Sequence, residues 1–300
     1  MAQRSRERIA AGLLVAAAGA VMLAQTPQLN MAPARRMGAA VTPAYEGWYP
    51  NPDGSFTLLI GYFNRNREQT LDILIGPDNK IEPGEPDQGQ PTHFLVQKAW
   101  GVFAVRVPKD FGSKKVTWTI TANGETLSIP FALHPNYVIT PFKDPAMGNL
   151  PPTLRFSEGG PASGPALSGP TLSGPALSGP PVGFAATLTA TAGVPLPITF
   201  WAADDNHTEE GAKPRQGPPV RVFLSKYRGP GTVTFSTARP DVGAGGKTTT
   251  EMTFSEPGEY VVRVQANDSS GDGGGGFQCC WTNAHVKMSV TPVKSVAPVK

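Results

Sequence analysis

The sequence predicts an all-β protein built from two sandwich-like domains, which a linker rich in Ser, Gly and Pro joins. Gly (34) and Pro (32) make up more than a fifth of the 300 residues, and both are unfavourable inside helices. Short segments rich in Val, Ile, Thr and aromatic residues recur along the chain. Many of them alternate apolar with polar side chains, which is the pattern of half-buried strands.

The N-terminus predicts export. Residues 1–8 carry three arginines, and residues 9–23 form an uncharged, mainly apolar run of 15. This is the order of a secretory signal, and the run is shorter than the roughly 20 residues that cross a bilayer. We therefore expect a signal peptide over residues 1–24, a flexible lead-in over residues 25–43 and a secreted or periplasmic location. Met22 is large for a position so close to a cleavage site, and an uncleaved segment would instead hold the protein at a membrane.

The charge balance argues against a nucleic-acid partner. Residues 1–24 hold three Arg and one Glu, so the processed chain carries 23 basic and 22 acidic residues. The resulting net charge of +1 is too small for a surface that neutralises many phosphates.

Residues 44–140 are predicted to form the first β domain. Asn123-Gly124 lies between two alternating segments, which is a strong signal for a two-residue hairpin. Turn-forming sequences at residues 51–54 and 76–79 separate further segments. The expected strands are 54–63, 70–75, 93–97, 100–107, 115–121 and 125–131.

Residues 141–183 interrupt this pattern and are interpreted as a linker. From Ser163 the chain repeats a five-residue unit, SGPAL or SGPTL. Residues 161–181 contain no aromatic and no charged side chain, so they cannot build a core. We expect an extended spacer of at most ~65 Å, and a ligand for a proline-reading domain is the alternative.

Residues 184–292 are predicted to form a second sandwich, and residues 293–300 a flexible tail. Seven short strands in about 110 residues match the size and strand number of an immunoglobulin-like domain. The expected strands are 184–191, 196–202, 220–227, 231–236, 247–254, 259–266 and 285–291.

Two segments of this second domain carry a family resemblance. The segment 254–268, FSEPGEYVVRVQAND, resembles the penultimate strand of PKD and cadherin-like extracellular domains, and 198–205, ITFWAADD, resembles their second strand. The resemblance covers about a third of the chain and implies an immunoglobulin-like sandwich. The connection 268–284 departs from it, because it is long and rich in Gly. The stretch YEGWYPNPDGSFTLLIGYFNRN in the first domain resembles exported bacterial proteins of unknown function.

Most of the unusual polar residues of the second domain are expected at one tip. The loops after the second and sixth strands lie at the same end of an immunoglobulin-like sandwich. Calcium takes six to eight oxygen ligands, and the resemblance to cadherin-like domains implies calcium near these positions. Ordinary solvated turn residues are the alternative. The candidate calcium ligands are Asp204, Asp205, Asn267, Asp268 and Asp272.

Cys279 and Cys280 are the only cysteines and they are adjacent. Neighbouring Cα atoms lie about 3.8 Å apart across a trans peptide and ~2.9 Å across a cis one, closer than in an ordinary disulfide. Three interpretations remain open: a vicinal disulfide, a pair of reduced or buried thiols, and a soft-metal or intermolecular site. In the metal interpretation His207 and His285 would join the pair as copper or zinc ligands.

We predict an exported, non-catalytic binding or adhesion protein. No catalytic residue and no organic cofactor is assigned, because the sequence lacks GxSxG and because GDGGGG (271–276) does not join a strand to a helix. The expected partner is a glycan or a cell-surface protein, and Trp281 is the predicted contact, since a flat ring stacks on sugar faces. The alternatives are an exported metal-dependent hydrolase or redox protein that uses the same tip, and a purely structural envelope module.

Overall fold

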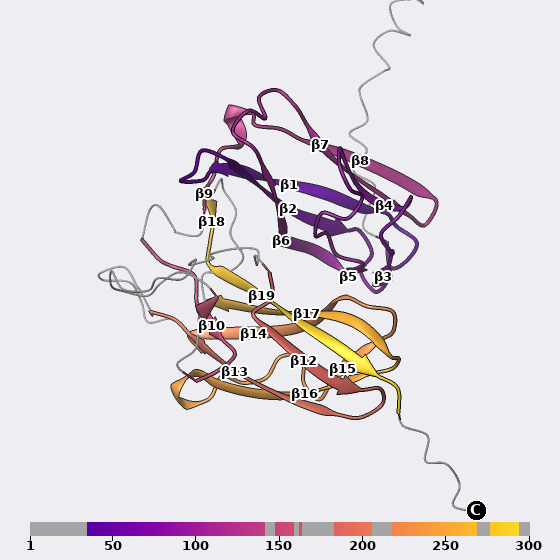
Figure 1. Ribbon diagram of the computed structural model, residues 1–300, viewed down its shortest axis with the longest axis vertical. Coiled ribbons are helices and arrows are strands. Elements are labelled where there is room, and N and C mark those ends of the chain that lie inside the picture. Colours follow the sequence, from indigo (N-terminus) through magenta and orange to yellow (C-terminus); the bar gives the residue numbers. More distant parts are fainter. Residues whose placement is uncertain are drawn as a thin grey trace, which may run out of the picture. The chain divides into compact units, whose positions relative to one another are not determined.

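The computed structural model describes residues 35–141, 148–158, 162–163, 183–205, 218–268 and 277–293 (Figure 1). These residues confirm the all-β prediction, because their regular structure consists of strands and two single 3-10 turns. No helix within these ranges is both long and apolar enough to cross a membrane. The predicted signal peptide and almost all of the SGPxL repeat lie outside the described residues.

The first sandwich has two antiparallel three-stranded sheets and a short strand pair. One sheet is β1 (Val41–Pro50), β2 (Phe56–Asn64) and β6 (Gln97–Val107); the other is β4 (Asn79–Glu82), β7 (Val116–Ala122) and β8 (Glu125–Phe131); the pair is β3 (Leu71–Asp72) and β5 (His93–Phe94). Side chains such as Ile60, Phe94 and Trp118 fill the core at 0% exposure. The predicted β7–β8 hairpin is confirmed, with positive φ at both Asn123 and Gly124 (51° and 79°).

Strand β1 was missed because its sequence, VTPAYEGWYP, is interrupted by Gly and Pro. It lies at the edge of its sheet, where Pro is tolerated because the strand needs hydrogen bonds on one side only. A register shift between Tyr45 and Gly47 accommodates the remaining irregularity. The first sandwich also includes residues before 44, since the buried amide of Asn66 exchanges two hydrogen bonds with the backbone of Ala39 (2.7 and 2.9 Å).

The second sandwich has the strand order of an immunoglobulin domain. One sheet runs β12–β19–β17–β14 and the other β11–β10–β13–β16–β15 (Figure 1); β12 pairs in parallel with β19, and the remaining pairs are antiparallel. Strands β10, β13, β16 and β15 correspond to A, B, E and D, and β14, β17 and β19 to C, F and G. The strands are β10 (Thr153–Arg155), β11 (Ala162–Ser163), β12 (Ala186–Thr191), β13 (Leu196–Ala203), β14 (Val220–Arg228), β15 (Val233–Phe235), β16 (Lys247–Phe254), β17 (Gly258–Asp268) and β19 (Trp281–Thr291).

Several strand bounds in this sandwich differ from the prediction, among them those of β10 and β19. Strand β10 falls inside the segment interpreted as a linker, yet it pairs with β13 through Leu154 and its two neighbours. Leu154 is fully buried in the second core, so these residues belong to the sandwich. Strand β19 begins at Trp281, four residues before the predicted strand 285–291. Both differences arise because pairing with distant strands extends an element beyond its own local pattern.

Candidate functional site

The two sandwiches meet through one face of the β12–β19–β17–β14 sheet. Along β19, the alternate residues Thr282, Ala284 and Val286 belong to the second sandwich, and the intervening Trp281, Asn283 and His285 point to its other face. All of these residues are buried. The outer face is buried because the first sandwich covers it: Asn283 Nδ2 donates to the carbonyl of Gly101 on β6. The residues that make these contacts are called the junction below.

Trp281 lies at the centre of one junction contact, with 0% exposure. It packs with Leu59 and Ile139, both outside the second sandwich. Gly101 allows this approach, because a Cβ there would lie 2.3 Å from the Trp281 ring. The prediction of Trp281 as an exposed ligand contact is therefore wrong for this structure, since the ring is used for packing between the two sandwiches.

Tyr227 makes a second contact between the two sandwiches. A register shift between Lys226 and Arg228 interrupts the end of β14, and the Tyr227 ring joins the core of the first sandwich at 4% exposure. Its hydroxyl donates to Gly89 O (2.6 Å) and its carbonyl accepts from Thr92 N (3.1 Å). A side chain of one sandwich thus completes the core of the other.

Ion pairs flank Tyr227. Lys226 Nζ, on a side chain only 5% exposed, contacts Asp72 Oδ1 at 2.6 Å, and His93 Nδ1 contacts the same oxygen at 3.0 Å. Burial alone would raise the pKa of Asp72, but the hydrogen bonds from His93 and Lys226 together lower it. Arg228 donates two hydrogen bonds to Asp87 (2.9 and 2.7 Å) and lowers the pKa of that carboxyl as well. Both pairs join the second sandwich to the first.

His285 occupies the apolar part of the junction. Its ring lies 4.1 Å from the ring of Tyr227, and its Nε2 has no hydrogen-bond partner among the described residues. Burial, followed by the charges of Arg263 and Arg228, lowers the pKa of His285 to about 3. The imidazole is therefore neutral in the folded protein at neutral pH.

Acid is expected to weaken the fold through His285. Between pH 6.5 and 3 the unfolded chain binds a proton here and the folded chain does not, so stability is lost as pH falls through this range. We expect a loss of about 2 kcal/mol between pH 7 and pH 5, measured by urea unfolding. His285→Phe should remove most of that loss. Equal losses in the wild type and in His285→Phe would contradict this role.

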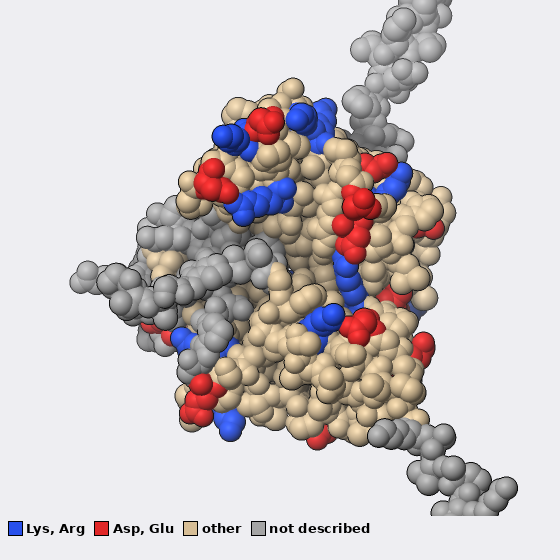
Figure 2. All heavy atoms as spheres, in the orientation of Figure 1, with Lys and Arg blue, Asp and Glu red and all other residues tan. Residues whose placement is uncertain are grey.

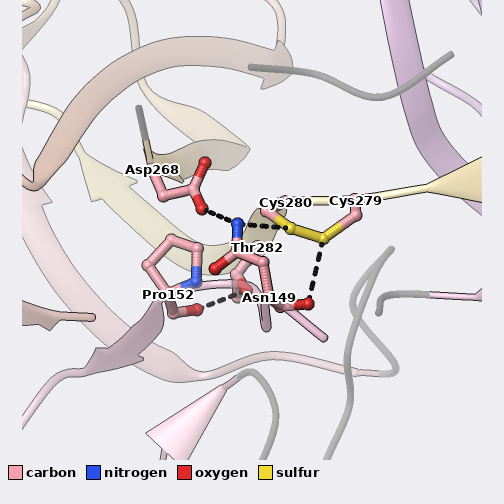
Figure 3. Close-up of a disulfide and its surroundings, with 6 residues drawn as sticks. All are labelled: Asn149, Pro152, Asp268, Cys279, Cys280 and Thr282. Atoms are coloured by element: carbon pink, nitrogen blue, oxygen red, sulfur yellow. Dashed lines mark hydrogen bonds between the residues drawn. A yellow bond between two sulfur atoms is a disulfide. The ribbon is translucent and has the colours of Figure 1, made fainter. Parts of the chain in front are cut away.

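The cysteine pair lies immediately before β19 and forms a disulfide (Figure 3). Of the three interpretations of this pair, the structure contains the vicinal disulfide. The Cys279–Cys280 peptide is cis, and the two residues are 3% and 1% exposed. Asn149, also buried, donates from Nδ2 to Cys280 Sγ (3.2 Å) and to Asp268 Oδ2 (2.5 Å). Thr282 Oγ1 donates to Pro152 O (2.5 Å).

Of the candidate calcium ligands that the structure describes, one is buried and hydrogen-bonded within the protein. Asp268 is 3% exposed, and its backbone N–H donates to Cys280 O (3.2 Å) while its carboxylate accepts from Asn149. Asp204 and Asp205 follow β13, and Asn267 lies within β17. Asp272 and His207 lie outside the described residues. Within the described ranges, no three His, Cys, Asp or Glu side chains are grouped to hold a metal ion.

Local sequence pattern does not indicate most of the junction residues. Lys226, Arg228 and His285 are polar, and polar side chains on the outer face of a strand usually indicate solvent. One signal was present in the sequence: Trp281 shares a strand face with Asn283 and His285. A large aromatic ring on an otherwise polar face suggests a packing partner.

Comparisons with known proteins do not assign the chain to a family, so the second sandwich is classified by its strand order. No family model and no curated protein matches the chain. Among solved structures, S-layer protein SbsC domains 4 and 5 align over 84% of this chain and 98% of theirs, at 11% identity and a TM-score of 0.23. The D00-D0 domain of intimin aligns over 84% and 100%, at 11% identity and a TM-score of 0.26. Titin Ig tandem domains A164-A165 align over 85% and 100%, at 10% identity and a TM-score of 0.21. At such TM-scores these alignments carry no argument about function.

Proposed function

We propose that this protein is an exported, non-catalytic binding or structural module whose two sandwiches act as one unit. The observation that carries the proposal is Tyr227, a residue of the second sandwich that lies in the core of the first. Separation of the sandwiches would expose Tyr227 and Trp281 and would leave Lys226 without Asp72. Because apolar exposure costs roughly 25 cal/mol per Å², the joined arrangement is favoured.

Export is supported by the predicted signal over residues 1–24 and by the oxidised cysteine pair, since disulfides persist in oxidising compartments. On the described part of the face in Figure 2, basic and acidic side chains are interspersed and are not gathered by sign. This distribution fits a partner other than nucleic acid. If the N-terminal segment is not cleaved, the same module would stand at a membrane surface.

For the binding role we propose a glycan or another component of the cell surface as the target. Because Trp281 is buried, we assign the proposed ligand contact to an aromatic group on the first sandwich. Tyr137 is 50% exposed, and its ring lies 5.2 Å from Tyr45 and 6.1 Å from His134. Trp48 Nε1 donates to His134 O (2.9 Å) and supports this segment. Exposed rings beside polar groups are suited to sugar faces.

The finer hypotheses about the second sandwich belong to this proposal. A PKD-like or cadherin-like relationship rests on the segments 198–205 and 254–268. Calcium binding now rests on Asp204, Asp205, Asn267 and Asp272, because the carboxylate of Asp268 is hydrogen-bonded to Asn149.

A pull-down of the processed protein on insoluble cell-surface glycan tests the binding role. We expect retention, and we expect Tyr137→Ala to weaken it about threefold to tenfold, which corresponds to loss of an aromatic contact. Phe184→Ala removes another exposed ring, 52% exposed, and should leave retention unchanged. Calcium and EDTA arms test the cation: equal retention and equal melting temperatures in both would remove calcium from the proposal. A folded protein that binds none of the glycan would favour the structural alternative.

A further inference from the structure

A disulfide between neighbours does not stabilise a fold as ordinary disulfides do. The loop-closure contribution depends on the length of chain that the bond closes, and Cys279 and Cys280 are separated by a single position in the sequence. The bond therefore restricts almost nothing in the unfolded chain. Its effect on this protein must be local to the folded state.

The surroundings of the pair are buried and made of three segments (Figure 3). Asn149 comes from the chain that leads into β10, Asp268 ends β17, and Thr282 belongs to the start of β19. Asn149 contacts the sulfur of Cys280, and its carbonyl oxygen lies 3.6 Å from Cys279 Sγ. Asn149, Asp268 and Thr282 are all between 0 and 3% exposed, so the sulfur atoms have little room to move.

The residues on either side of the cysteine pair in the sequence both contact elements outside the second sandwich. On one side β18 (Phe277–Gln278) pairs in parallel with β9 (Thr140–Pro141), the segment that leaves the first sandwich. On the other side Trp281 packs against Gly101. The disulfide thus lies between two contacts that join the C-terminal part of the chain to elements that precede the second sandwich.

We propose that the Cys279–Cys280 disulfide stabilises the junction and can be reduced by a dithiol. Its reduction would loosen the packing of Trp281 against the first sandwich. In the exchange the dithiol gives up two S–H hydrogens and becomes a disulfide. The Cys279–Cys280 bond breaks, and each sulfur takes one proton and one electron. Two thiols result, and that of Cys279 faces the carbonyl of Asn149.

Packing explains why this reaction would reach the junction. Sulfur atoms that are no longer bonded stand farther apart than bonded ones, and a tightly packed interior resists added volume. With Asn149 on one side and Trp281 next in the chain, one of the two must shift. Either shift disturbs a contact that holds β19 in place.

The test uses the whole processed protein, which has no other cysteine. Dithiothreitol is added under native conditions, free thiols are counted by alkylation and mass, and melting is measured for both forms. We expect two thiols per chain and a melting temperature lower by roughly 3–10 °C in the reduced form. Tryptophan emission should shift to longer wavelength on reduction, and the shift should be absent in Trp281→Phe.

The double variant Cys279→Ala, Cys280→Ala is the matched control, and its melting should not respond to dithiothreitol. The main measurement compares oxidised and reduced wild-type protein. The test therefore remains decisive even if the double variant folds poorly. Coincident melting of reduced and oxidised wild type would overturn the proposal. Failure to reduce the pair at any dithiol concentration that preserves the fold would also overturn it. Neither result depends on glycan binding, so the proposed function and this inference can fail separately.

Discussion

Replacing Trp281 with Ala is expected to lower the free energy of unfolding by about 3–5 kcal/mol, the range for large aromatic residues in a packed core. The ring is fully buried, and Leu59, Ile139 and Gly101 surround it. Its loss would leave a cavity between the sandwiches that the surrounding strands cannot fill. A ligand-contact role predicts the opposite outcome, in which binding falls and stability does not change.

Urea unfolding of the full chain measures this loss, and Trp100→Ala is the matched control. Trp100 is only partly buried and stacks with Lys98 at 4.3 Å, so its removal should cost much less. Gly101→Ala provides a second control, because its Cβ would collide with the Trp281 ring. That substitution should cost less in the Trp281→Ala background than alone, and this non-additivity identifies the contact. Additive effects would place the Trp281 ring elsewhere.

Replacing Tyr227 with Ala is also expected to cost about 3–5 kcal/mol, with a further consequence for cooperativity. Because Tyr227 lies in the core of the first sandwich, the wild type should unfold in a single transition. Without the ring, the sandwiches should lose one of the two aromatic contacts that link them. We therefore expect two separable transitions in Tyr227→Ala, observed by calorimetry.

Two control variants separate the causes. Tyr227→Phe keeps the ring and loses the hydrogen bond to Gly89 O, which should cost about 1 kcal/mol and preserve a single transition. Phe223→Ala removes a partly buried ring from the same strand that stacks with Arg239. It should also preserve a single transition. If Tyr227→Ala behaves like Phe223→Ala, Tyr227 does not couple the two sandwiches.

The sequence predicts two domains joined only by a linker over residues 141–183, whereas in the structure the two sandwiches are also in direct contact. In the described part of the chain, Lys226 contacts β3 of the first sandwich, and Tyr227 and Arg228 contact the loop between β4 and β5. Strand β10, on the N-terminal side of the SGPxL repeat, already pairs within the second sandwich. The repeat therefore leaves from and returns to the same sandwich, since β12 follows it.

Features that depend on local pattern could be predicted from the amino-acid sequence. Alternation predicted the strands of the second sandwich, Asn123-Gly124 predicted the β7–β8 hairpin, and adjacency made a vicinal disulfide one of three interpretations of Cys279 and Cys280. Such features are legible because side-chain period and turn chemistry act over a few residues.

The burial of particular polar faces could not be predicted without the folded structure. Asp268 is a candidate calcium ligand by sequence and His285 a possible copper or zinc ligand, and both are buried in the folded chain. Trp281 changed from an expected ligand contact to a packing residue for the same reason. A strand with one apolar face has the same sequence pattern whether its polar face meets water or a second sandwich. What distinguishes the two cases is contact between residues more than a hundred positions apart, such as Asn283 with Gly101, and no local pattern encodes such a contact.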